Sequence, residues 1–383
     1  MDNSPSELHW YEIELLDLVL IREAKPFNPG DGSWAKGQFP PPPITVFQGL
    51  RSALPQRIDQ RTDRDLSFLG PFLLHEASDG TQTLWLPTPK DLLSQFPRLL
   101  DDEPQTASTA VARLCPIDLA QEEMQFVGFD AAHFAASLTP MLPPASAEHG
   151  YGRLQPWMNA DRLVDYLQGS LSRLSHTDLC DNPWTVQVLP HIQMQAGTRQ
   201  VKDQDGYFTE VAVRLKPGWK LIAGFSGAIP TPAAVRLGGE GHRAIVQSCP
   251  VPSVWTDLQK FKQPQQESDT AYLLTPGLAE VTTGSDLYAP YPGLWAEQLQ
   301  GCATDRPILW GGISVLQRLT DVTAAIGFTP QRAFVPPGTV YRFKHPPVEA
   351  GKLLPSLIDR PSRWLETFDT LGYGTLLWNC IGS

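Results

Sequence analysis

The chain has 383 residues, of which 42% are hydrophobic, so it can bury a core, and wholesale disorder is excluded. Its formal net charge of −11 excludes a nucleic-acid binder that relies on bulk positive charge, but it permits a narrow basic track. The 37 prolines are spread along the chain at roughly twice the average usage, which predicts many rigid loops and edge strands.

The five cysteines are widely separated and form no CxxC pair, so the sequence predicts no structural zinc and no other metal site. A sparse, odd number of cysteines is typical of a reducing compartment. The N-terminus has neither a basic n-region nor an apolar h-region, and no apolar run approaches the ~20 residues of a membrane helix. We therefore expect a cytoplasmic protein that does not associate with a membrane.

The first predicted strand covers residues 11–21, and a loop rich in glycine, proline and basic residues follows over 22–37. Four consecutive prolines at 40–43 then precede a predicted helix. A proline run is stiff, and proline is well accepted in the first turn of a helix. The helix is indicated by an apolar stripe at helical spacing, formed by Val46, Phe47, Leu50, Ala53 and Leu54.

Gly49 and Arg51 lie beside this apolar stripe. A glycine inside a helix costs about 0.5–1 kcal/mol relative to alanine, which suggests that another group approaches the backbone at Gly49. The alternative is a stiff loop followed by a helix that simply tolerates its glycine. The residues alone leave both readings open.

Residues 66–93 predict two strands around a Ser-Asp-Gly turn, followed by a short helix, and residues 94–155 have the polar, small-residue composition of a variable insertion. A helix is expected over 159–174, with Asn159 as a possible N-cap. Strands predominate after residue 184. Pro217 and Gly218 fit the centre of a type II turn and predict a hairpin between the runs on either side. The chain is therefore expected to be α+β, with more strands than helices.

Enzyme signatures are absent from the sequence: it contains no GxxxxGK[ST], HExxH or GxSxG motif, and no motif for a bound cofactor. His191 is the most plausible general base, although a half-buried structural histidine on a strand is the simpler reading. We therefore expect no catalytic residues.

The segment RLGGEGHR (236–243) predicts a glycine-rich turn between two strands. Gly238 and Gly239 would let the backbone approach a ligand closely, with N–H groups turned towards an anion. Arg236, His242 and Arg243 supply positive charge beside the turn. The segment therefore favours a phosphate-binding role, with a simple hairpin turn as the alternative.

The loop at 22–37 carries Arg22, Lys25 and Lys36, interleaved with the aromatic residues Phe27 and Trp34. Cations that bind phosphates and aromatic faces that stack on bases are the elements of single-stranded RNA recognition. A solvated surface loop with no ligand remains the alternative.

The chain resembles the third-subunit family of the Cmr module, which belongs to the RAMP superfamily and to type III-B CRISPR effector complexes. The resemblance rests on the ordered segments IREAKPFNPGDGSW…FPPPPITVFQGLRSAL, GPFL…LWLPTPKDLL, RLGGEGHRAIV, AYLLTP and FVPPGTVYRF, and it weakens over residues 94–155. At LWGGISVLQRL (309–319) the chain departs from the family pattern, because Ile313 stands where an aromatic residue is expected soon after the glycines.

This resemblance implies two tandem ferredoxin-like (RRM-type) domains with loop-rich insertions, at 1–215 and 216–383, the first carrying the insertion at 94–155. It also implies a non-catalytic subunit of a ribonucleoprotein complex for antiviral defence, which holds the 5′ repeat-derived tag of the guide RNA. The implied partners are that RNA, the large polymerase-like subunit and the backbone subunits of the complex. Combined with the residue patterns above, it gives as expected RNA-binding residues Arg22, Lys25, Trp34, Lys36, Gly49, Arg51, Arg236, Gly238, Gly239, His242 and Arg243.

The alternative function is a metal-independent endoribonuclease that processes CRISPR transcripts, since related RAMP proteins do so. Such an enzyme needs a general base for the 2′-hydroxyl, and His191 or His242 would have to provide it.

Overall fold

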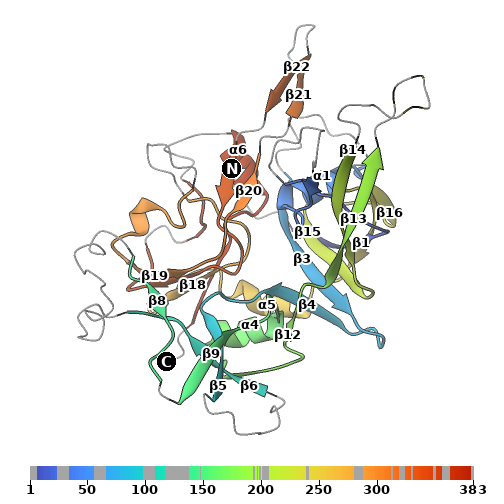
Figure 1. Cartoon of the computed structure of the whole chain (residues 1–383). Coiled ribbons are helices and arrows are strands. Elements are labelled where there is room, and N and C mark those ends of the chain that lie inside the picture. Colours follow the sequence, from blue (N-terminus) through green and yellow to red (C-terminus); the bar gives the residue numbers. More distant parts are fainter. Residues whose placement is uncertain are drawn as a thin grey trace.

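The computed structural model shows a mixed α+β chain in which antiparallel sheets dominate and helices are few (Figure 1). It describes residues 7–23, 34–55, 66–97, 108–117, 138–146, 148–192, 195, 197, 200, 207–238, 241–279, 288–311, 314–318, 324–328, 331–347, 351–355 and 363–380. The predicted α+β class is confirmed, whereas the two tandem ferredoxin-like domains remain a prediction.

The centre of the molecule is an eight-stranded antiparallel sheet. In spatial order its strands are β12 (Leu179–Cys180), β10 (Trp157–Asn159), β4 (Gln82–Pro87), β3 (Phe68–Glu76), β15 (Trp219–Phe225), β1 (His9–Leu15), β17 (Arg243–Cys249) and β16 (Ala233–Arg236). The period of two along its central strands sends alternate apolar side chains to opposite faces. On β15, for example, Leu221 joins one core cluster and Ile222 joins the other.

Helices cover both faces of this sheet. Helix α1 (Pro43–Arg51) packs on one face through Val46, Phe47 and Leu50. The helices α4 (Ala160–Leu167) and α5 (Ser253–Gln259) lie together on the other face (Figure 1). The Asn159 side chain accepts a hydrogen bond from the backbone N–H of Asp161 at 2.9 Å, so the predicted N-cap of α4 is confirmed.

A second antiparallel sheet is built from the C-terminal part of the chain. Its order is β19 (Leu299–Ala303), β24 (Val340–Phe343), β18 (Thr270–Leu273) and β25 (Leu376–Trp378). Its core includes Trp295, Tyr341 and Trp378, and Trp295 belongs to the short 3₁₀ helix η2 (Gly293–Trp295). The helix α6 (Arg363–Thr370) instead contributes Phe368 to the core that contains α1.

Smaller sheets surround these two. One contains β11 (Arg173–Ser175), β6 (Ser108–Arg113), β5 (Leu92–Pro97) and β9 (His149–Arg153), and another contains β13 (Trp184–Ile192), β14 (Tyr207–Leu215) and β2 (Trp34–Lys36). Three strand pairs complete the fold: β7 (Cys115–Pro116) with β8 (Met141–Leu142), β20 (Ile308–Trp310) with β23 (Arg332–Phe334), and β21 (Ser314–Arg318) with β22 (Ala324–Phe328).

Several local predictions are wrong in extent or in kind. The first strand ends at Leu15 and not at residue 21, and α1 ends at Arg51, before Ala53 and Leu54. The helix expected over 159–174 ends at Leu167, and strand β11 occupies its last residues. The Pro217–Gly218 turn forms, with Gly218 at φ +80° and a hydrogen bond from Trp219 N to the Lys216 carbonyl, but the strands it joins do not pair with each other. β14 pairs with β13 and β2, whereas β15 enters the large sheet between β1 and β3. The short helix expected just before residue 94 is also absent, because strand β5 occupies that segment.

The domain division at residue 215 stays a prediction. Strands from both sides of it hydrogen bond within the large sheet, and sheet membership changes between Cys249 and Thr270. In the described part of the chain, every helix is too short or too polar to cross a lipid bilayer.

Candidate RNA-binding site

Several of the predicted RNA-binding residues meet at a pocket of about 450 Å³, which we call the cationic pocket. Its wall is formed by the chain around Arg22, by helix α1, by the turn after β16 and by the end of β20. Two arginines, Arg22 and Arg236, line it, and none of its described lining residues is acidic. The pocket thus collects positive charge on a chain whose net charge is −11.

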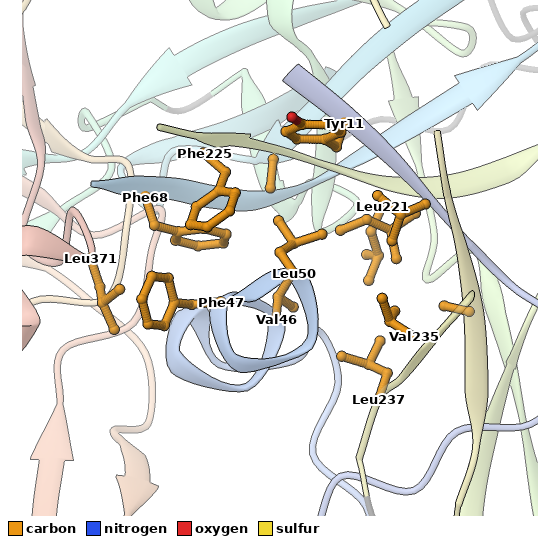
Figure 2. Packing of buried hydrophobic residues seen from close by; sticks show 14 of the residues in the cluster. Tyr11, Val46, Phe47, Leu50, Phe68, Leu221, Phe225, Val235, Leu237 and Leu371 are labelled. Carbon is orange, nitrogen blue, oxygen red and sulfur yellow. The ribbon is translucent and has the colours of Figure 1, made fainter. Parts of the chain in front are cut away.

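Helix α1 has an apolar face, which packs into the core, and an opposite polar face. Its backbone enters the helix from the proline run, and Pro43 occupies the first helical position, where a missing N–H costs nothing. Figure 2 shows Phe47 beside Phe68 and Phe225, and the ring centroids lie 6.1 and 5.8 Å apart. Burial of this face aims the opposite face at the cationic pocket.

That polar face was missed by the sequence reasoning. Thr45 and Gln48 of α1 and its C-cap residue Ser52 recur at i, i+3 and i+7 and line the pocket together with Gly49. Their spacing was a usable signal, because polar residues at helical period mark the face opposite the apolar stripe. Leu309 of β20 also lines the pocket, and no local signal could have placed it there.

Gly49 is buried, and the group that approaches it belongs to the chain itself. A Cβ on Gly49 would lie 3.4 Å from both the Arg236 carbonyl oxygen and the Leu237 Cδ1. Both distances lie at the edge of ordinary van der Waals contact, so the end of β16 packs closely against the helix at Gly49. Gly49 also lines the cationic pocket, so its predicted contact with RNA stays a prediction.

The glycine-rich turn forms where it was predicted, between β16 and β17. Gly238 has φ +79°, and a Cβ there would come within 3.0 Å of the Leu20 carbonyl oxygen. Only glycine fits this backbone and this contact. Gly238 is solvent-exposed and lines the pocket, while Gly239 lies outside the described residues.

The charges at the turn are arranged unfavourably for the unliganded protein. Arg236 and Arg243 are directly opposite each other in the β16–β17 register, and both are exposed. Like charges at opposite positions of two strands repel each other. No described carboxylate lies within ion-pair distance of either guanidinium, so an anion between them would relieve the repulsion.

None of the remaining predicted RNA-binding residues is among the described lining residues of the cationic pocket. Arg51 ends α1, where a cation also interacts favourably with the helix dipole, and it does not line the pocket. Trp34 and Lys36 belong to β2, whose backbone pairs with β14, and their side chains are outside the description. Lys25 lies outside the described residues.

Neither candidate catalytic histidine lines the cationic pocket. The Nε2 atom of His191, a half-buried residue of β13, lies 3.0 Å from Oε2 of the buried Glu210. His242 is half-buried beside the glycine turn, and its Nε2 atom is buried from solvent. Among the described residues, no group of three or more histidine, cysteine, aspartate or glutamate side chains is arranged to hold a metal ion.

Solved structures with a similar chain come from CRISPR effector complexes. A chain of the "Type III-B Cmr-beta bound to cognate target RNA" is 12% identical, with a TM-score of 0.47 and coverage of 96% of each chain. The same assembly with AMPPnP gives 11% identity, a TM-score of 0.43 and coverage of 87% of this chain and 86% of the other. A chain of the "Csm1-Csm4 cassette in complex with pppApA" gives 11%, 0.30 and 88% of each chain.

No curated protein matches the sequence. The sequence profile described as "CRISPR-associated protein (Cas_Cmr3)" matches residues 11–380. This match covers nearly the whole length, and the chain therefore belongs to the Cas_Cmr3 family of CRISPR-associated proteins.

Proposed function

We propose that this chain is the third, non-catalytic subunit of a type III-B CRISPR effector complex and that it binds the guide RNA in the cationic pocket. Family membership supports the complex, and the geometry supports the binding. By family resemblance, the RNA segment is the 5′ repeat-derived tag, and the protein partners are the large polymerase-like subunit and the backbone subunits. The same resemblance suggests two ferredoxin-like domains and a cytoplasmic location.

The observation that carries the proposal is the convergence of Arg22, Arg236 and the Gly238 turn on one pocket. These residues come from segments more than 200 positions apart in sequence. Guanidinium groups bind phosphate oxygens with two parallel hydrogen bonds, and an exposed glycine turn offers backbone N–H groups. A phosphodiester in the pocket could thus be bound both by the guanidinium groups and by backbone N–H groups of the glycine turn.

The polar face of α1 suits the rest of a nucleotide. Thr45, Gln48 and Ser52 carry hydroxyl and amide groups that can donate to and accept from ribose hydroxyls or base edges. A narrow site of this kind is compatible with an acidic protein, since only a few phosphates need be neutralised. The remaining acidic surface then discourages non-specific binding of nucleic acid.

The experiment measures the affinity of the full chain, and of the assembled complex, for guide RNA as a function of salt. Each phosphate contact to a single strand contributes ~0.7 to the slope of log affinity against log salt. We expect the double variant Arg236→Ala/Arg243→Ala to weaken binding and to reduce this slope by about one contact or more. An unchanged affinity and slope would remove the site.

The matched control is Arg173→Ala. Arg173 is an exposed arginine of β11, where it hydrogen bonds to Ser108, and it lines neither pocket. The Arg173→Ala substitution removes one positive charge, as the single substitution Arg236→Ala does. An equal loss of RNA affinity in these two single variants would therefore indicate a bulk electrostatic effect only. A guide RNA with a scrambled tag of equal length distinguishes tag recognition from general RNA binding.

A further inference from the structure

A second pocket, of about 200 Å³, adjoins the cationic pocket, and we call it the aromatic pocket. Its aromatic lining residues are Phe72, Trp85, Trp157, Trp310, Phe334 and Tyr373. Prolines of the 40–43 run complete one wall, and among the described lining residues only Lys90 is charged. The Lys90 ammonium lies 3.3 Å from an Asp305 carboxylate oxygen, so its charge is already compensated.

The two pockets share three lining residues, Gln38, Pro42 and Trp310. A ligand seated in the cationic pocket can therefore extend directly into the aromatic one. Gln38 is half-buried at this junction, and its side-chain amide makes no hydrogen bond with a described residue. An amide offers both donors and an acceptor, the combination that reads a base edge.

We propose that the aromatic pocket receives one unstacked nucleobase of the RNA strand whose phosphate occupies the cationic pocket. This inference rests on the proposed function. Phosphate and base are joined by a single ribose, so adjacent polar-cationic and apolar-aromatic sites match the two ends of one nucleotide. An apolar cavity of about 150 Å³ holds benzene, and the larger aromatic pocket has room for a planar heterocycle.

An apolar or aromatic side chain of a partner protein is the competing occupant, and the charges at the junction disfavour it. The adjoining cationic pocket is lined by Arg236 and, among described lining residues, by no carboxylate. A protein segment there would need its own acidic residue to avoid burying the Arg236 guanidinium, which forms no ion pair with a described carboxylate. A nucleotide brings the negative charge with it.

The test combines an abasic scan of the RNA with a substitution that fills the pocket. We expect removal of the base at one position to lower affinity about tenfold to a hundredfold, as loss of a base–aromatic stacking contact does. Ile308 is a partly buried lining residue, and Ile308→Trp should fill the space. We expect this variant to bind intact RNA as weakly as the wild type binds the abasic RNA, with no further loss when the two changes are combined.

The control is Ile245→Trp, since Ile245 is partly buried on β17 and lines neither pocket. If no single base is needed while Arg236→Ala still weakens binding, the base pocket is wrong and the RNA site stands. If Arg236→Ala has no effect either, the proposed function itself fails. A photo-crosslinking residue at position 308 should form adducts with RNA in the assembled complex, and adducts with another subunit instead would overturn the inference.

Discussion

Replacing Gly238 by alanine should destabilise the protein more than replacing Gly241 by alanine, although both glycines have φ +79°. An L-residue in the left-handed region costs roughly 1–2 kcal/mol, and this cost applies to both positions. A Cβ on Gly241 meets nothing within 4 Å, so Gly241→Ala should cost only that amount.

At Gly238 the new methyl group also meets the Leu20 carbonyl oxygen at less than 3.0 Å. The clashing atom is backbone, so it cannot rotate away as a side chain would. Forcing an extra methyl into packed structure typically costs ~1–3 kcal/mol, which brings the total for Gly238→Ala to ~2–5 kcal/mol. The turn would shift away from Leu20 and open the cationic pocket, so RNA affinity should fall as well.

Urea denaturation of the two variants, followed by tryptophan fluorescence, measures the difference. We expect Gly238→Ala to have the lower midpoint, with an unchanged slope, and Gly241→Ala to retain RNA binding. Equal midpoints for the two variants would show that the contact between the turn and Leu20 does not constrain the structure.

Other substitutions test the fold and its pH dependence. Leu50→Ala should lower the unfolding free energy by about 2–5 kcal/mol because Leu50 is fully buried on the core-facing side of α1, and denaturation checks this. Asn159→Ala should cost ~0.5–2 kcal/mol through loss of the α4 cap, whereas Asn159→Asp, which keeps an acceptor, should cost less. Burial raises the pKa of Asp91, whose side chain accepts a hydrogen bond from Tyr166 Oη. Because the folded state holds this proton more tightly than the unfolded state, the contribution of Asp91 to the free energy of unfolding is full at low pH and is lost as the pH rises. Asp91→Asn should therefore lose less stability than the wild type as the pH rises above about 4, the ordinary pKa of an aspartate, and a parallel decline of both proteins would contradict this assignment.

Local patterns predicted the parts of the site that lie within one segment. The proline-braced helix, its apolar stripe and the glycine turn between β16 and β17 all follow from nearby residues. The strands on either side of Pro217–Gly218 show the limit of this reasoning. The turn type is local, but the choice of partner strand depends on which sheet offers a free edge.

The walls of the site could not have been predicted in the same way. Trp310 reaches both pockets from a strand about 270 residues beyond Gln38, and no spacing rule connects them. Gly49 shows a related difficulty, because the sequence indicated a close approach to its backbone but could not say whether the approaching group was ligand or protein. In the structure the nearest groups to Gly49 belong to the end of β16 and the residue after it, at ordinary contact distance.

The most direct measurement is crosslinking of guide RNA to the intact effector complex, with each adduct mapped to a residue of this chain. The account predicts that adducts of the repeat-derived end gather on the segments around Arg22, on the polar face of α1 and on the turn at Gly238. Adducts confined to other surfaces of the chain, or a repeat-derived end bound wholly by other subunits, would contradict it.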